Sequence, residues 1–123
     1  FAAAPKEAVP KNVRFLGYVT DAEAKALMQG SLLFLYPTLY EGFGLPPLEA
    51  LSCGARVAVS DTEVMREVLG DAALYVDPRT PGLPEEVSSP ADGEAVSRTL
   101  SKYDWALSAR ALLSLLLPKG ECS

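Results

Sequence analysis

Short apolar runs alternate with segments of mixed polar and apolar residues along the first two-thirds of the chain. Runs of this kind, rich in β-branched, aromatic and aliphatic side chains, favour β-strands. The run SLLFLY at 31–36 has no polar alternation, which is typical of a strand buried on both faces. We predict four strands, at 13–19 (interrupted by Gly17), 31–36, 56–60 and 73–76.

Helical segments with recognisable boundary residues separate these strands. The sequence TDAE at 20–23 is a capping box, which predicts a helix that ends near Gly30. Two prolines at 46–47 suit the first turn of a second helix, LEALSC, that ends at Gly54. A third helix is expected around 63–69. This alternation predicts a Rossmann-like α/β fold, a parallel sheet with helices on both faces.

The pattern changes after Pro78, where prolines and glycines become frequent and apolar anchors become few. We therefore divide the chain into a Rossmann-like core, a Pro-rich linker or loop and a helical tail, at residues 1–78, 79–91 and 92–123.

Two helices are expected in the tail, near 92–103 and 104–117. The second carries several large apolar side chains. We expect its apolar face to dock on the rest of the chain through Trp105, Leu112, Leu113 and Leu116.

The composition excludes several kinds of chemistry. The 123 residues carry a net charge of −5 and include no His. The acidic balance argues against nucleic acid or an anionic membrane as a partner, and no apolar run approaches the length of a membrane span. The absence of His removes the catalytic triads that contain it and His-ligated zinc. Reaction chemistry has to rest on carboxylates, Lys or Arg, hydroxyls or backbone dipoles.

The two cysteines do not make a disulfide framework. Cys53 lies within an apolar helical pattern and is predicted to be a small buried core residue, whereas Cys122 lies in the tail. This usage fits a reducing compartment, so we predict a cytoplasmic protein. The N-terminus has neither Met nor the features of a signal peptide, which leads us to expect a processed or excised piece of a longer protein.

The segment 37–47, rich in Pro and Gly, is the strongest candidate for a ligand site. It follows the most apolar strand, and parallel α/β sheets bind ligands beyond the carboxyl ends of their strands. Gly42 and Gly44 allow the backbone to approach a ligand closely. The helix that begins near Leu45 or Pro46 turns its N–H groups and positive dipole end toward the loop, which suits a diphosphate.

Two acidic residues, Glu41 in the loop and Glu49 in the helix, flank this segment. Two acids at different depths of one crevice suit two hydroxyl-bearing parts of a ligand, and a carboxylate that accepts hydrogen bonds from a ribose diol recurs in nucleotide sites. The alternative for each is a solvated charge, which near a helix N-terminus contributes about 0.3–1 kcal/mol. Phe43 fits a ligand contact and a core side chain equally well.

Other residues near the loop have plainer default interpretations. We expect Tyr36 to pack in the core and Arg66 to be solvated. Asp61 and Thr62 follow a strand end and are candidates for lining the cleft.

The stretch YPTLYEGFGLPPLEALSCGARVAVSD at 36–61 resembles the donor-site signature of the retaining family-4 glycosyltransferases of GT-B fold. Their mark is E-x7-E with EGFGLP between the acids, followed by an A-x-x-x-G run into a buried strand. The similarity extends from Asn12 through Pro78, a little over half the chain. A bare E-x7-E is a weak signal, but EGFGLP in this strand context is specific.

The resemblance implies a role for each residue of the signature. Glu41 matches the first acid, which sits by the donor sugar as a nucleophile or as a group that orients and stabilises the sugar. Glu49 matches the acid that holds the nucleotide ribose. The residues whose backbone contacts sugar hydroxyls and phosphate are matched by Gly42, Phe43, Gly44 and Leu45.

The implied reaction is transfer of a hexosyl group from a nucleotide diphosphate to an acceptor hydroxyl, with retention of configuration and without a metal or cofactor. The transition state is oxocarbenium-like, so a nearby carboxylate stabilises it.

The resemblance also implies what this chain lacks. Members of the family have two Rossmann-like domains, and the N-terminal one supplies the acceptor site. An Arg and a Lys that bind the donor diphosphate have no match here, since Lys6 and Lys11 stand in another context. We therefore expect the parent protein to be a hexosyltransferase, and this chain alone to be inactive without the N-terminal domain.

Two other functions remain open. One is a non-catalytic assembly module whose exposed interdomain face forms a homodimer. The other is a different GT-B relative, such as a nucleotide-sugar epimerase or phosphorylase, against which the EGFGLP signature argues.

Overall fold

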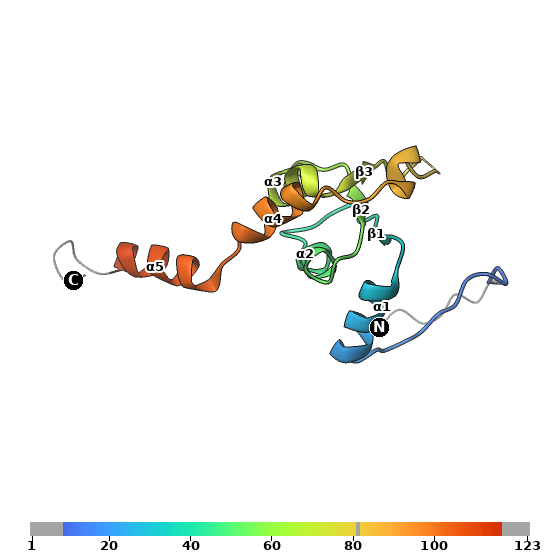
Figure 1. The fold of residues 1–123 in the computed structure, drawn as a ribbon, viewed down its shortest axis with the longest axis horizontal. Coiled ribbons are helices and arrows are strands. Elements are labelled where there is room, and N and C mark those ends of the chain that lie inside the picture. The colour runs from blue at the N-terminus through green and yellow to red at the C-terminus, as the bar shows by residue number, and fades with distance from the viewer. Residues whose placement is uncertain (1–8, 81, 117–123) are drawn as a thin grey trace.

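The computed structural model describes residues 9–80 and 82–116. Its centre is a parallel sheet of β1 (Phe34–Tyr36), β2 (Val57–Ser60) and β3 (Leu74–Val76), in the order β1-β2-β3 (Figure 1). Strands that are neighbours in the chain are therefore neighbours in the sheet. The predicted Rossmann-like α/β class with a parallel sheet and a C-terminal helix is confirmed.

The helices follow the predicted order closely. α2 connects β1 to β2, α3 connects β2 to β3, and two short 3-10 turns, η1 and η2, follow α3 and β3. The bounds are α1 Asp21–Gly30, α2 Leu45–Ser52, α3 Glu63–Leu69, η1 Gly70–Ala72, η2 Glu85–Ser88, α4 Gly93–Ser101 and α5 Trp105–Leu116.

The capping box that begins α1 is confirmed. The Thr20 hydroxyl accepts a hydrogen bond from the Glu23 amide at 3.3 Å, and the Glu23 carboxylate accepts one from the Thr20 amide at 2.8 Å. The bond from the Thr20 amide lowers the pKa of Glu23 below its ordinary value. The helix buries none of its residues, so its start depends on these local bonds.

The hydrophobic core lies where α2 and α3 pack against β2. Every residue of β2 is buried, as expected for a central strand of a parallel sheet. The largest buried apolar side chains include Leu51 from α2, Val57 and Val59 from β2, and Met65 from α3. Burying a side chain of this size contributes about 1.5–3 kcal/mol, so these contacts fix the position of the helices on the sheet.

The strand predicted at 13–19 is absent, and this prediction is wrong. The segment has no regular structure, and its apolar side chains are exposed, Phe15 at 54% and Tyr18 at 76%. Gly17 has a φ of 69°, which an extended strand does not permit. Apolar and β-branched residues form a strand only when a neighbouring strand pairs with them, and within the described residues this segment has none.

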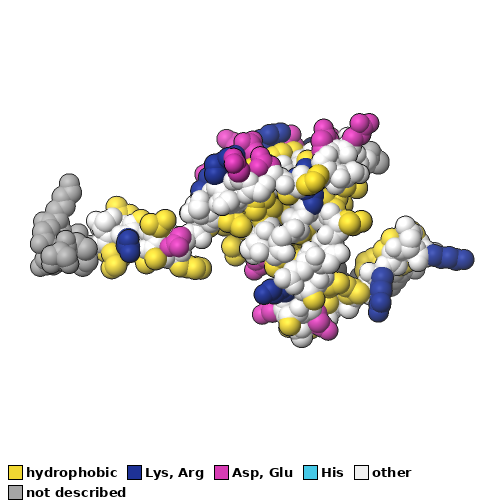
Figure 2. All heavy atoms as spheres, viewed as in Figure 1, with side chains coloured by type: hydrophobic (Ala, Val, Ile, Leu, Met, Phe, Trp, Pro, Cys, Tyr) yellow, Lys and Arg dark blue, Asp and Glu magenta, His cyan; other side chains and the backbone are white. Residues whose placement is uncertain are grey.

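The predicted docking of the last helix is also wrong. α5 buries no residue, and Trp105 is 91% exposed. Figure 2 shows hydrophobic side chains on the surface of this extended helix. In Figure 1 this helix extends away from the sheet. The other expected contacts, Leu112, Leu113 and Leu116, are 57%, 48% and 70% exposed. None of the helices in the described ranges is long and apolar enough to cross a membrane.

The two predictions on cysteine have different outcomes. Cys53 follows α2 directly and is half-buried rather than a core residue, because it caps the helix next to exposed Gly54. Cys122 lies outside the described residues.

Candidate functional site

The loop that joins β1 to α2 ends in a glycine with an unusual backbone conformation. Gly44 is the N-cap of α2, has a φ of 91° and provides no side chain to cap the helix. It is buried, and a Cβ atom at this position would lie 2.7 Å from Cε of Met65 in α3. The positive φ favours glycine here, and any larger residue would also have to displace the end of the Met65 side chain.

Few amides are available at the start of α2. Pro46 and Pro47 carry no N–H group, so the first turn offers the amides of Gly44 and Leu45. Within residues 9–80 and 82–116, the amides of residues 42–45 donate no hydrogen bond to the backbone outside the helices and strands. These unbonded donors lie at the positive end of the helix dipole, which makes this loop a suitable place for an anion.

The carboxylate of Glu41 is held by a neighbouring side chain. It is half-buried, and its Oε1 accepts a hydrogen bond of 2.5 Å from the Tyr36 hydroxyl at the end of β1. This bond, more than burial, raises the pKa of Tyr36 to about 12. Tyr36 packs against the core as predicted, and it also holds the carboxylate of Glu41 in place.

Glu49 lies in a different environment. Its exposed side chain lines a groove of about 470 Å³, which we call the apolar groove. The groove is bounded by the start of α2 and by the junction of α4 and α5. Its lining residues are Phe43, Leu45, Leu48, Glu49, Ser52, Leu100, Tyr103, Asp104, Trp105 and Ser108.

The far wall of the apolar groove is fixed to the loop by an aromatic pair. The rings of Phe43 and Tyr103 meet edge to face, with their centroids 5.3 Å apart. The Tyr103 hydroxyl donates a hydrogen bond of 3.0 Å to the carbonyl of Val68 in α3. Phe43 is 40% exposed, so it serves both as a packing partner and as part of the groove surface.

A second, polar cleft of about 360 Å³ lies at the carboxyl ends of the strands. We call it the strand-end cleft. Each strand contributes the residues that follow it, and the prediction that Asp61 and Thr62 line the cleft is confirmed. Its lining residues are Thr38, Leu39, Asp61, Thr62, Asp77, Pro78 and Arg79.

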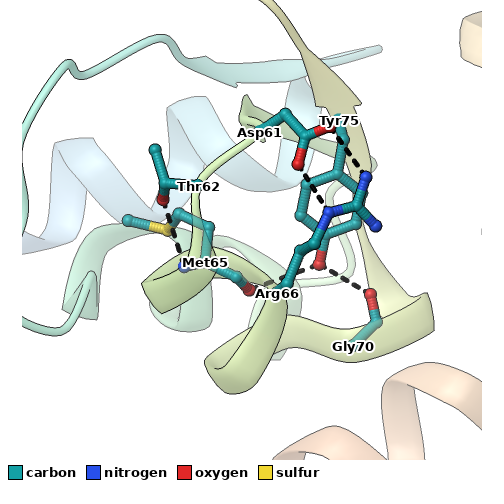
Figure 3. Close-up of polar contacts among 6 residues, drawn as sticks. All are labelled: Asp61, Thr62, Met65, Arg66, Gly70 and Tyr75. Carbon is teal, nitrogen blue, oxygen red and sulfur yellow. Dashed lines mark hydrogen bonds and ion pairs between the residues drawn. The ribbon is translucent and has the colours of Figure 1, made fainter.

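Asp61 is held in place by Arg66 from α3 (Figure 3). The guanidinium donates two hydrogen bonds to the carboxylate, at 2.5 and 2.8 Å, and lies 4.3 Å from the centre of the Tyr75 ring. The bonds from Arg66 lower the pKa of Asp61, and burial raises the pKa of Tyr75 to about 12. Arg66 is exposed as predicted, but it is paired rather than only solvated.

The structure brings three of the six predicted site residues together. Phe43, Leu45 and Glu49 line the apolar groove, whereas Glu41 lines neither the apolar groove nor the strand-end cleft. Tyr103 and Trp105 also line the apolar groove but were not predicted as site residues. Their signal was the pair of aromatic residues in YDW, between two helical patterns.

Metal ligands do not gather in the described residues. No group of three or more His, Cys, Asp or Glu side chains is placed to hold an ion in residues 9–80 and 82–116. Metal-independent chemistry remains a prediction.

Comparison with known proteins gives consistent similarities. The family profile "Glycosyl transferases group 1" matches residues 2–88. Over 66 residues the chain is 50% identical to O-antigen chain mannosyltransferase B of Escherichia coli. The aligned region is 54% of this chain and 17% of that protein. Over 97 residues it is 36% identical to the serotype-specific mannosyltransferase WbdA of Escherichia coli. This aligned region is 78% of this chain and 12% of that protein.

A more distant relative aligns with a larger share of the chain. The phosphatidyl-myo-inositol mannosyltransferase of Mycobacterium leprae is 29% identical over 115 residues, 84% of this chain and 31% of that protein. The chain thus spans less than a third of the length of each of these relatives.

Proposed function

Because the chain belongs to the family of group 1 glycosyl transferases, we propose that it forms the donor-binding part of a retaining hexosyltransferase. The single observation that supports this role most strongly is the loop at residues 42–45. Its unbonded amides lie at the start of α2, directly beside the groove that contains Glu49. This arrangement offers donors for a diphosphate next to an acceptor for a ribose.

The donor is a nucleotide-diphosphate hexose in this proposal. The amides of Gly44 and Leu45, with those of Gly42 and Phe43, bind the phosphate oxygens. Glu49 accepts hydrogen bonds from the ribose diol. The relatives compared above are mannosyltransferases, so a nucleotide-activated mannose is the first hexose to test.

Glu41 acts beside the sugar. The hydrogen bond from Tyr36 occupies Oε1 and fixes the orientation of the carboxylate, which leaves Oε2 to face the sugar. Positive charge develops at the anomeric carbon in the transition state, and an oriented carboxylate stabilises that charge. In this proposal Glu41 serves as the nucleophile or as the stabilising group, and the anomeric configuration is retained.

The complete enzyme requires the remainder of the protein. The chain spans only 12–31% of the relatives' length, and the acceptor site lies in the N-terminal domain of the family it resembles. We infer that the 123-residue chain binds donor weakly, transfers nothing alone, and belongs to a cytoplasmic, metal-independent enzyme. Hexosyl transfer by the isolated chain, from any nucleotide sugar, would refute the claim of inactivity.

Donor binding is tested by NMR titration of the chain with UDP-, GDP- and ADP-hexoses. We expect shifts in the amides of 42–45, 48 and 49, and the absence of a shift with every donor would reject the proposal. Glu49→Gln removes a charged acceptor and should weaken binding about tenfold or more. Glu94→Gln is the matched control, since that side chain is 92% exposed on α4 and lines neither site, and it should leave binding unchanged.

Assembly is the second candidate function, and the exposed apolar surface of α5 favours it. The exposed leucines of this helix include Leu115, at 82%, and Leu116, at 70%. Sedimentation velocity over a range of concentrations, with and without nucleotide, tests this candidate. A homodimer that forms regardless of nucleotide supports assembly, and a monomer at all concentrations rejects it.

A further inference from the structure

The loop before α2 has a backbone with wide conformational freedom and one large side chain that is able to restrain it. Phe43 lies between Gly42 and Gly44, and glycine has the widest backbone freedom of any residue. A Cβ atom at Gly42 would meet nothing within 4 Å, so no neighbouring atom restrains the backbone on that side. The amides of this loop therefore keep one direction only if contacts at Phe43 and Gly44 hold the loop against the rest of the fold.

The first of these contacts is made directly with α3. Gly44 is buried, and a Cβ atom built on it would lie 2.7 Å from Cε of Met65. Met65 is fully buried in the hydrophobic core, which makes it a firm surface for the loop backbone. This contact holds the last residue before α2, and the residues ahead of it need a second contact.

Tyr103 provides the second contact and connects Phe43 to the same helix. The rings of Phe43 and Tyr103 meet edge to face, at an interplanar angle of 89° and with their centroids 5.3 Å apart. The Tyr103 hydroxyl donates a hydrogen bond of 3.0 Å to the carbonyl of Val68. Val68 follows Met65 by three residues, about 4.5 Å along the axis of α3. The two contacts thus attach neighbouring residues of the loop to one short stretch of α3.

Tyr103 is itself held firmly, because the end of α4 is bonded to the end of α3. The buried Thr99 of α4 donates a hydrogen bond of 3.1 Å to the carbonyl of Leu69, next to the carbonyl that Tyr103 uses. Burial also raises the pKa of Tyr103, so its phenol remains protonated, and therefore a donor, at neutral and mildly alkaline pH.

We propose that Tyr103 is a positioning residue for the loop at residues 42–45 and acts through the ring of Phe43. With that ring fixed, the amides around it keep the orientation in which they receive phosphate oxygens. Donors that are ordered before binding hold an anion more tightly, because less conformational freedom is lost on binding. This inference rests on the proposed function, because it takes phosphate as the ligand of the loop.

Two variants separate the ring contact from the hydrogen bond. Tyr103→Leu removes both, whereas Tyr103→Phe retains the ring and loses only the bond to Val68. Tyr75→Phe is the matched control. The Tyr75 hydroxyl also donates to backbone carbonyls in and directly after α3, those of Met65 at 3.2 Å and Gly70 at 2.7 Å, but its ring lies against Arg66 (Figure 3).

The order of the loop is measured in the chain without ligand by NMR relaxation of the backbone amides. In Tyr103→Leu we expect the order parameters of residues 42–44 to fall from about 0.85, typical of rigid backbone, to below about 0.6. Tyr103→Phe should give a smaller decrease, and Tyr75→Phe should give none. The amides of residues 48–52 in α2 should stay ordered in all three variants, which shows that the fold is intact. Unchanged order at 42–44 in Tyr103→Leu would overturn the inference.

Affinity for inorganic pyrophosphate is the second readout. Pyrophosphate has no sugar or base, so a change in its binding reports on the loop rather than on direct contacts of Tyr103 in the apolar groove. By calorimetry, Tyr103→Leu should weaken pyrophosphate binding about two- to tenfold, the range that corresponds to the loss of an edge-to-face pair. Tyr103→Phe should retain most of the affinity, and Tyr75→Phe all of it. If Tyr103→Leu weakens GDP binding but not pyrophosphate binding, Tyr103 contacts the nucleotide directly and the positioning role is rejected.

The outcomes also separate this inference from the proposed function. If pyrophosphate and the nucleoside diphosphates bind, and Tyr103→Leu changes neither the loop order nor the pyrophosphate affinity, the positioning role is rejected and the donor site stands. If no phosphate ligand binds to the unaltered chain, the donor site and the positioning role are both rejected.

Discussion

The helices α2 and α5 are both built mainly from apolar residues, yet only α2 is buried. α2 packs Leu48, Ala50 and Leu51 against the sheet and its neighbouring helices. α5 is longer, with 12 residues against 8, and buries none of them. The difference lies in the partner surface. The strands β1 and β2 provide a surface on which α2 packs, whereas no described part of the chain provides such a surface for α5.

This contrast shows what determines burial in this chain. Apolar content alone gives a helix that is able to pack, and a facing surface is needed before packing stabilises it. The same holds for 13–19, which has the composition of a strand and no partner strand. We therefore expect substitutions in the buried region to change the free energy of unfolding more than substitutions in the exposed region.

The largest expected effect is the loss of a buried leucine. Leu51→Ala, at a position 2% exposed, should destabilise the fold by about 2–5 kcal/mol through lost burial and a cavity. Leu115→Ala on α5, at a position 82% exposed, should change stability by less than about 0.5 kcal/mol. Urea unfolding of both variants measures the difference. Equal effects would show that α5 packs in solution.

The loop before α2 should show the next largest effect. Gly44→Ala places a Cβ atom 2.7 Å from Met65 Cε and forces alanine into a φ of 91°, so we expect a loss above the roughly 1–2 kcal/mol of the backbone strain alone. Gly54→Ala has a φ of 84° with nothing within 4 Å, and measures the strain without the clash. Thermal unfolding of the pair isolates the steric part. An identical loss in both variants would contradict the close approach to Met65.

A local effect is expected at α1, which buries no residue. Thr20→Ala removes the capping box and should cost about 1 kcal/mol, seen as fraying of α1 by hydrogen exchange while β2 stays protected. Because the folded-state pKa of Glu23 is lowered, the stabilisation is present above its unfolded pKa and is lost as the pH falls through the folded value. Fraying that is independent of pH would contradict the role of Glu23. Lys25→Ala, in the same helix, is the control.

The smallest effect concerns the site itself and is read by titration. Glu41→Gln removes the charged acceptor, so the pKa of Tyr36 should fall from about 12 toward its ordinary value, while Tyr75, raised to about 12 by burial, should not change. In the unaltered chain the Tyr36 contribution to stability is full below the ordinary pKa and is lost as the pH rises through 12. NMR of labelled tyrosine rings as a function of pH measures the pKa values of Tyr36 and Tyr75 separately. An unchanged Tyr36 would show that the hydrogen bond to Glu41 does not form in solution.

Local signals predicted much of the fold. The capping box, the prolines at 46–47 and the glycines at 54 and 70 each mark a helix boundary close to its observed place. These features act over a few residues, so a single sequence is enough to recognise them. The three strands that pair were also predicted, because each is a short apolar run beside a helix.

The parts that were not predicted depend on contacts between distant residues. The ring contact between Phe43 and Tyr103 and the hydrogen bond from Tyr103 to Val68 join segments separated by 60 and 35 residues. The bond from Tyr36 to Glu41 is local, but it depends on how the loop turns at the end of β1. Composition and spacing do not determine such contacts, which is why the apolar groove was found only in the structure.

The strand order β1-β2-β3 has a consequence for how the chain folds. Each strand meets the next after a single intervening helix, so the sheet forms by closing two short loops in succession. Parallel sheets usually fold slowly, because their contacts join residues far apart in sequence. Here the paired strands are separated by only 23 residues (Phe34 to Val57) and 16 residues (Ala58 to Leu74), so we expect β1-α2-β2-α3-β3 to form as one local unit.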